Sequence, residues 1–283
     1  MAAEATVVGR EAAGALVPRR ATRIGLRSVA LLYLVVLLIV PVGLVFYRAF
    51  EPGLGALWSS ITTPAAISAF WLTITVTAIA VPLNTVFGVI TAIAIVRGRF
   101  RGRALLDALI DLPFAVSPVV VGLALVLVYA RPGWFGKWFI AHGIPIIFAT
   151  PGLVLATIFV SLPFVVREVA PVLRELGDES EQAAATLGAG PWQTFSRITL
   201  PALRWAIAYG VVLSLARAIG EFGAVSVVSG HIAGQTNTLT LLVEARLDNL
   251  DTAGAYAASA LLAAIAIVAL LAMTLLRPRR ELR

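Results

Sequence analysis

The sequence contains no cysteine and only two histidines, and only 13% of its 283 residues are charged. Without cysteine the chain forms no disulfide and offers no thiol nucleophile or thiolate metal ligand. His142 and His231 are too few for a histidine-rich metal site. Because soluble domains carry about 25% charged residues, the shortage of charge also argues against a soluble protein.

Apolar side chains are in excess and make up 60% of the residues. A single soluble core cannot bury so much apolar surface, whereas a bilayer supplies an apolar environment. The net charge of +7 is compatible with nucleic-acid binding, but the basic residues flank apolar stretches and form no basic face interleaved with aromatic residues. We therefore expect a membrane protein that contacts lipid and has no nucleic-acid partner.

Six apolar stretches are near or above the roughly 20 residues that a membrane-spanning helix needs. The first is read as an uncleaved span because Tyr47 and Arg48, and no small-residue cleavage site, follow it. The predicted fold is an all-α membrane protein with six transmembrane helices, at about 28–46, 70–96, 104–130, 146–166, 202–229 and 253–276.

Lys and Arg residues set the orientation of these spans. With the N-terminus in the cytoplasm, seventeen of the 22 Lys and Arg residues fall in cytoplasmic segments and four in external ones, and Arg217 lies inside a span. Such an excess marks the cytoplasmic side of a membrane protein. The sequence thus predicts a cytoplasmic tail of residues 1–27, a membrane domain of residues 28–276, and a cytoplasmic tail of residues 277–283.

The long segment 167–201, between the fourth and fifth spans, is expected in the cytoplasm. Asp178 can cap a first short helix, with Glu181 three residues later as in a capping box. Gly188 then introduces a turn, and Pro191 suits the first position of a second helix at 192–199. A small alanine-rich helix that ends at a glycine turn can fit a groove on another protein; the alternative is a solvated amphipathic loop.

The spacing within this segment resembles the EAA loop of bacterial ABC importer permeases. That pattern is Glu-Ala-Ala, three residues, Gly, nine residues and Ile-x-Leu-Pro, and every spacing agrees. Gln182 replaces the usual Glu, with Glu181 beside it, which leaves open any salt bridge that the family's Glu makes. The resemblance implies a site that couples the chain to an ATPase, made of Glu181, Gln182, Ala183, Ala184, Thr186, Leu187, Gly188, Ile198, Leu200 and Pro201.

Other segments resemble a smaller group within these permeases. Residues 111–120 and 216–224 resemble the sulfate and molybdate permease branch, and residues 225–239 resemble sulfate and thiosulfate permeases of the W type. The resemblance implies a bacterial inner-membrane importer of sulfate or thiosulfate. Its other parts would be a homologous T-type permease, two cytoplasmic subunits that bind ATP and Mg, and an external sulfate-binding protein.

This chain itself has no Gly-x-x-x-x-Gly-Lys-Ser/Thr phosphate loop. We therefore expect it to bind no cofactor and to be no enzyme by itself. The alternatives are a permease for molybdate or a related oxyanion and, less favoured because no internal repeat is visible, a secondary transporter.

Charged residues inside the predicted spans are candidates for function. Arg217 and Glu221 lie four residues apart, on one face of a helix. Since a charge within the membrane costs about 2.5–3.5 kcal/mol, both should face the bundle interior or water. We favour an ion pair that ties helices together; the alternative is that Arg217 helps an anion to cross.

The third span carries further candidates. Pro113 and Pro118 should kink it beside Ser117, and such a kink can be a gate in the translocation path or a fixed bend. Asp107 and Asp111 share a face of this span. Their expected partners are Arg101 and Arg103, or arginines of the segment 167–201.

Overall fold

The computed structural model describes the backbone of residues 20–276 and the side chains of residues 25–271. Most of the predicted N-terminal tail and all of the predicted tail 277–283 lie outside these limits. Every regular element in the described part is a helix. Five helices are long and apolar enough to cross a membrane, and a bent helix pair would make a sixth. The all-helical membrane fold is therefore confirmed.

The chain divides into two compact units, and the first ends at Val45. Its described part contains α1 (Arg20–Leu34), the π-helix η1 (Val35–Ile39) and the start of α2 (Val40–Phe50). One candidate span, Gly25–Phe50, runs from α1 through η1 to the end of α2 and contains the predicted first span.

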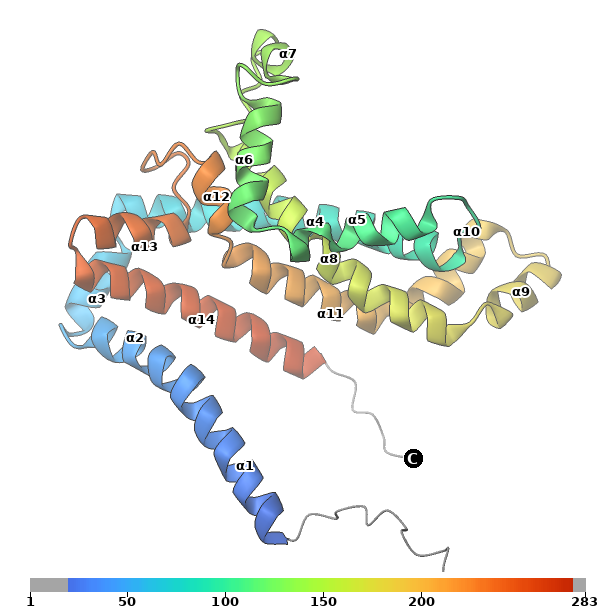
Figure 1. The fold of residues 1–283 in the computed structure, drawn as a ribbon, viewed down its shortest axis with the longest axis horizontal. Helices are drawn as coiled ribbons and strands as arrows, with labels where there is room; N and C mark the ends of the chain where they lie inside the picture. Colours follow the sequence, from blue (N-terminus) through green and yellow to red (C-terminus); the bar gives the residue numbers. More distant parts are fainter. Residues whose placement is uncertain (1–19, 277–283) are drawn as a thin grey trace, which may run out of the picture. The chain divides into compact units, whose positions relative to one another are not determined.

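The second unit is a bundle built around α4 (Pro64–Arg97), α8 (Thr150–Leu176) and α11 (Leu200–Ile219) (Figure 1). Thr63 caps α4 by accepting a hydrogen bond from the Ala66 N–H at 3.2 Å. The buried Asn84 of α4 donates to the Ser161 hydroxyl of α8 at 2.8 Å. Glycine at position 210 lets α11 approach α8, because a Cβ there would lie 3.0 Å from the Val165 Cα.

The predicted fourth span ends too early. The helix α8 continues ten residues past Val166, so the first ten residues of the expected 167–201 loop are helical. The predicted last span agrees with α14 (Thr252–Leu276).

The third predicted span is not one kinked helix. The helix α5 (Arg103–Ala115) ends before Val116, and α6 (Pro118–Tyr129) leaves it at 111°. Proline disfavours the helical conformation of the residue before it, and Ser117 is extended with ψ 134°. The sequence predicts a kink at this proline, whereas the structure has a complete break.

The fifth predicted span is also interrupted. The helix α11 ends at Ile219, and a separate short helix, α12 (Gly223–Val228), follows. In Figure 1, α12 lies beside α6, and the packing is close because Gly122 of α6 has no side chain. A Cβ at Gly122 would lie 2.7 Å from the Ala224 carbonyl oxygen.

The remaining elements lie at the end of the bundle away from α9 (Glu179–Thr186) and α10 (Pro191–Thr194) or project from it (Figure 1). They are α3 (Leu54–Ile61), α7 (Gly136–Ala141) and α13 (Leu239–Asp248). Arg246 of α13, which the charge count places in an external segment, points inward. Its guanidinium donates to the carbonyl oxygens of Gly254 at 2.7 Å and Ser60 at 2.8 Å, and so joins α13 to α14 and to the end of α3.

Candidate functional site

The segment 177–199, here called the α9 hairpin, is the part of the chain whose spacing suggested a docking surface. The helix α9 (Glu179–Thr186) is followed by a turn and by α10 (Pro191–Thr194), with Pro191 in the first helical position as predicted. The turn closes with two hydrogen bonds, from the Ala189 N–H to the Ala184 carbonyl and from the Gly188 N–H to the Ala185 carbonyl, both 3.0 Å. This is a Schellman motif, which needs a left-handed residue between the helices.

Gly188 is that residue, with φ +84°. The predicted glycine turn is therefore present. Leu187 beside it is 89% exposed and Trp192 after it is 74% exposed, so the hairpin presents apolar side chains outward. The predicted cap is wrong: the Asp178 side chain makes no capping hydrogen bond to α9.

Glu181 holds the hairpin to the bundle. Its carboxylate pairs with the Arg97 Nε at 3.2 Å and accepts a hydrogen bond from the Thr199 hydroxyl at 2.9 Å. Arg97 is the last residue of α4, and its Nη2 also donates to the Gly177 carbonyl. We call these contacts the Glu181 latch, because they join three separate elements.

This role of Glu181 is not predicted from the sequence. The sequence indicates Glu181 only as a capping residue and as a neighbour of Gln182, and Arg97 only as one of the charges that orient the spans. No local pattern connects the two residues, which are 84 positions apart.

The hairpin continues without interruption into a long helix. The helix α10, the π-helix η2 (Phe195–Thr199) and α11 form one stretch of 29 residues, Pro191–Ile219. At 1.5 Å per residue this stretch is roughly 40 Å long. It begins beside the exposed turn and ends just after Arg217.

A cavity of about 390 Å³ lies at the break between α5 and α6, and we call it the helix-break cavity. It brings together four residues that the sequence singles out, one of which is Pro113 at the end of α5. Ser117 and Pro118 line it from the break, and Arg217 lines it from α11. Val160 and Phe164 of α8 complete one wall.

Arg217 and Glu221 form the predicted ion pair, with the Arg217 Nη1 2.6 Å from a Glu221 carboxylate oxygen. The other Glu221 carboxylate oxygen accepts a hydrogen bond from the Ala224 N–H at 2.8 Å, at the start of α12. The Glu221 backbone carbonyl accepts one from the Thr240 hydroxyl at 2.8 Å. Glu221 therefore connects α11, α12 and α13, as the favoured interpretation required.

The acids of α5 pair with an arginine of the segment 167–201, the second of the two expected sets of partners. Arg167 of α8 pairs with Asp107 at 3.1 Å and donates to Asp111 at 2.7 Å. Arg167 was counted among the loop arginines, and the structure places it inside a helix. The three side chains clamp α5 against α8.

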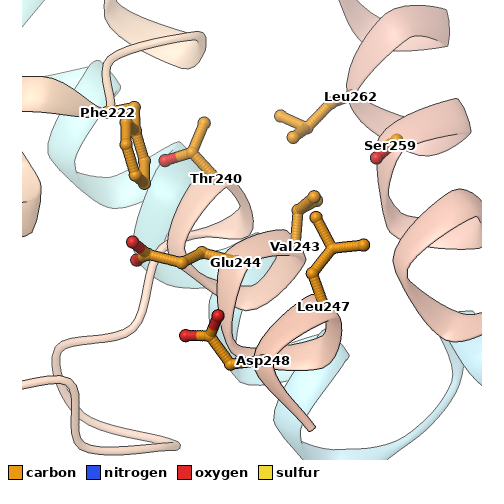
Figure 2. A pocket seen from close by; sticks show the side chains of 8 residues that line it. All are labelled: Phe222, Thr240, Val243, Glu244, Leu247, Asp248, Ser259 and Leu262. Atoms are coloured by element: carbon orange, nitrogen blue, oxygen red, sulfur yellow. The ribbon is translucent and has the colours of Figure 1, made fainter. Parts of the chain in front are cut away.

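A larger cavity, of about 460 Å³, lies between α13 and α14 (Figure 2). Its lining is mostly apolar, and its two charged residues are Glu244 and Asp248, one turn apart on α13. Among the residues whose side chains the structure describes, no basic one lines it. Two carboxylates without a cation repel an anion, so the helix-break cavity is the better candidate for an anionic ligand.

Comparison with known proteins defines the class. The family model described as "Binding-protein-dependent transport system inner membrane component" matches residues 84–282. The chain belongs to this family of membrane-embedded transport components. A bacterial ABC transporter involved in the import of the acidic polysaccharide alginate shares the fold in its crystal structure. Its TM-score is 0.75 at 18% identity, with 92% of this chain and 96% of that chain covered.

More similar relatives carry a specific name. The chain is 50% identical to "Sulfate transport system permease protein CysW" of Synechocystis sp., over 89% of this chain and 91% of the relative. It is 47% identical to the CysW protein of Escherichia coli K12, over 87% and 84% of the two chains. The CysT protein of the same organism is 38% identical, over 88% and 90%.

The Glu181 latch can be tested by hydrogen exchange. Glu181→Ala removes a half-buried ion pair and a hydrogen bond, which together contribute about 1 kcal/mol. We expect the backbone amides of α9 to exchange about fivefold faster, because local opening costs that much less. Glu179→Ala is the matched control, since Glu179 is an exposed acid on the same helix outside the latch. Equal exchange rates in the two variants would show that the latch does not hold α9.

Proposed function

We propose that this chain is the transmembrane permease subunit of an ATP-driven importer of sulfate and thiosulfate. The observation that carries the proposal is 47–50% identity to proteins named sulfate transport permeases, over nearly their whole length. The chain's own part is to form the path; ATP and Mg would be bound by separate subunits.

The proposed topology has six spans with both termini in the cytoplasm of a bacterium, in the inner membrane. The Glu181 latch supports it, because it puts the carboxyl ends of α4 and α8 on the same side. Between those two ends the chain must cross the membrane twice, and α8 is one of the two crossings. The bent pair α5 and α6 therefore counts as the other. Residues 28–276 would then be the permease domain, with cytoplasmic tails at 1–27 and 277–283.

The α9 hairpin is the proposed docking element for two cytoplasmic ATP-binding subunits. Its exposed turn offers Leu187 and the alanine face of α9 to a groove, in the manner of a helix bound in a groove. ATP-driven closure moves a permease only if the ATPase contacts it differently in its open and closed states. The unbroken helix from Pro191 transmits such a contact to Arg217.

The proposal includes three other partners. A homologous T-type permease would complete the path, and a soluble sulfate-binding protein would deliver the substrate from outside; membrane lipid surrounds the spans. Two observations on relatives support this. CysT proteins are similar to this chain, and the alginate transporter, at a TM-score of 0.72, was crystallised in complex with a periplasmic protein that holds an alginate pentasaccharide.

The substrate assignment is tested on the purified assembly with its binding protein. We expect sulfate and thiosulfate to stimulate ATP hydrolysis, and the isolated chain to hydrolyse none. Molybdate is the comparison anion. Stimulation by molybdate alone would make molybdate the substrate. Hydrolysis by the isolated chain would contradict the proposal that separate subunits hydrolyse ATP.

The docking role is tested at Gly188. Gly188→Asp and Gly188→Trp put a side chain on a left-handed backbone, at a cost of about 1–2 kcal/mol, and enlarge the exposed turn. We expect these variants to reach the membrane but to lose the ATP-binding subunits or to hydrolyse ATP without uptake.

Gly190→Ala is the control for this test. Gly190 has an ordinary φ of −73° and open space around the position of a Cβ, so we expect normal uptake. Normal uptake and normal complex stability in the Gly188 variants would show that the hairpin is not the coupling element.

A further inference from the structure

The helix-break cavity contains main chain that is not helical within a membrane-spanning pair. Such backbone is tolerated in a membrane only where protein covers it or where it lines a water-filled space. Ser117 is exposed, and its side chain makes no capping hydrogen bond to α6. The described part of this chain therefore leaves the break uncovered, and it opens into the helix-break cavity.

Arg217 contributes hydrogen-bond donors to this space. Its ion pair with Glu221 uses Nη1. Among the described residues, its Nε and Nη2 donate to no protein group, and the side chain is 31% exposed. A guanidinium presents its donors in a planar fork that matches two oxygens of an oxyanion.

Glu221 is fixed in place and lies outside the lining of the cavity. Its side chain is 1% exposed, and its second oxygen is held by the Ala224 N–H. Both oxygens of the carboxylate have a partner, so an anion in the cavity meets an arginine whose charge is already balanced. Such a site binds weakly, which suits transit, because a path that binds its ion tightly releases it slowly.

We propose that the helix-break cavity is a transient binding site for the transported oxyanion. The free edge of Arg217 holds two of its oxygens, and Glu221 keeps the affinity low. This inference rests on the proposed function for its substrate class. The volume of about 390 Å³ is several times the space that one water molecule needs, so it has room for a tetrahedral oxyanion.

The test uses a single cysteine in the complete transporter, reconstituted in lipid vesicles. The natural chain has no cysteine, so Ser117→Cys gives one reporter thiol in the cavity. Its reaction with N-ethylmaleimide is followed on this chain by mass, in sulfate or in chloride at equal ionic strength. Ser59→Cys is the control variant, because Ser59 is an exposed serine of α3 outside the cavity.

We expect sulfate at ten times its half-protecting concentration to slow labelling of the Ser117→Cys variant about tenfold and to leave labelling of the Ser59→Cys variant unchanged. Adding Glu221→Gln leaves Arg217 unbalanced, and the new amide oxygen can still accept from the Ala224 N–H. In that background the half-protecting sulfate concentration should fall about tenfold. With Arg217→Gln and Glu221→Gln together, protection should disappear, whereas a purely structural pair would leave it in place.

The outcomes separate this inference from the substrate assignment. Protection by molybdate in place of sulfate, with the same dependence on Arg217, would support the site and reassign the substrate. If no oxyanion slows labelling of the Ser117→Cys thiol, or if protection survives the double change at Arg217 and Glu221, the inference is wrong. If the doubly changed protein fails to assemble, the Glu221→Gln variant alone is the test. A tenfold fall in its half-protecting sulfate concentration supports the inference, and an unchanged concentration contradicts it.

Discussion

The bilayer's demand that each backbone polar group be satisfied shapes this protein. Long helices meet it within themselves, and the described chain is accordingly helical. The two interruptions, before Pro118 and after Ile219, come together in space, because α6 packs on α12. Glu221 satisfies part of the second interruption by accepting from the Ala224 N–H. The same carboxylate pairs with Arg217, which lines the cavity at the first interruption. Glu221 therefore links the interruption after Ile219 to a cation beside the interruption before Pro118.

The opposite end of the long helix is organised around Glu181. One carboxylate joins the end of α4, the start of the hairpin and the π-helix before α11. Each contact is partly exposed and contributes little energy alone. Their value is geometric, since the latch and the Gly188 turn fix α9 relative to the helix that begins at Pro191. In the proposed mechanism, this arrangement would carry a push on the hairpin to the helix-break cavity without passing through a flexible loop.

Much of this was predictable from sequence because it depends on local chemistry. Apolar runs of sufficient length identified α4, α8 and α14, and the left-handed turn at Gly188 followed from glycine between two short helices. The i, i+4 spacing of Arg217 and Glu221 predicted their pair. Hydropathy could not show the breaks, because an apolar run stays apolar when the helix changes direction at Ser117.

Long-range contacts were beyond the sequence for a different reason. No residue near Arg97 in the sequence indicates that it pairs with Glu181. None near Asp111 indicates that it pairs with Arg167 rather than with Arg101. The choice depends on which helix ends meet in three dimensions. Asp178 failed as a cap although its residue type is favoured there, because its backbone (φ −114°, ψ 3°) is not in the β region that a capping residue adopts.

The claim that α9 and the helix Pro191–Ile219 move as one body is tested most directly by spin-label distances. Labels at Glu179→Cys and Leu213→Cys can be placed in this cysteine-free chain and measured by double electron–electron resonance, without nucleotide and with ATP trapped. The account predicts that this distance stays constant between the two states, while the distance from Glu179→Cys to the paired permease changes. A change between Glu179→Cys and Leu213→Cys as large as the change between the permeases would contradict it.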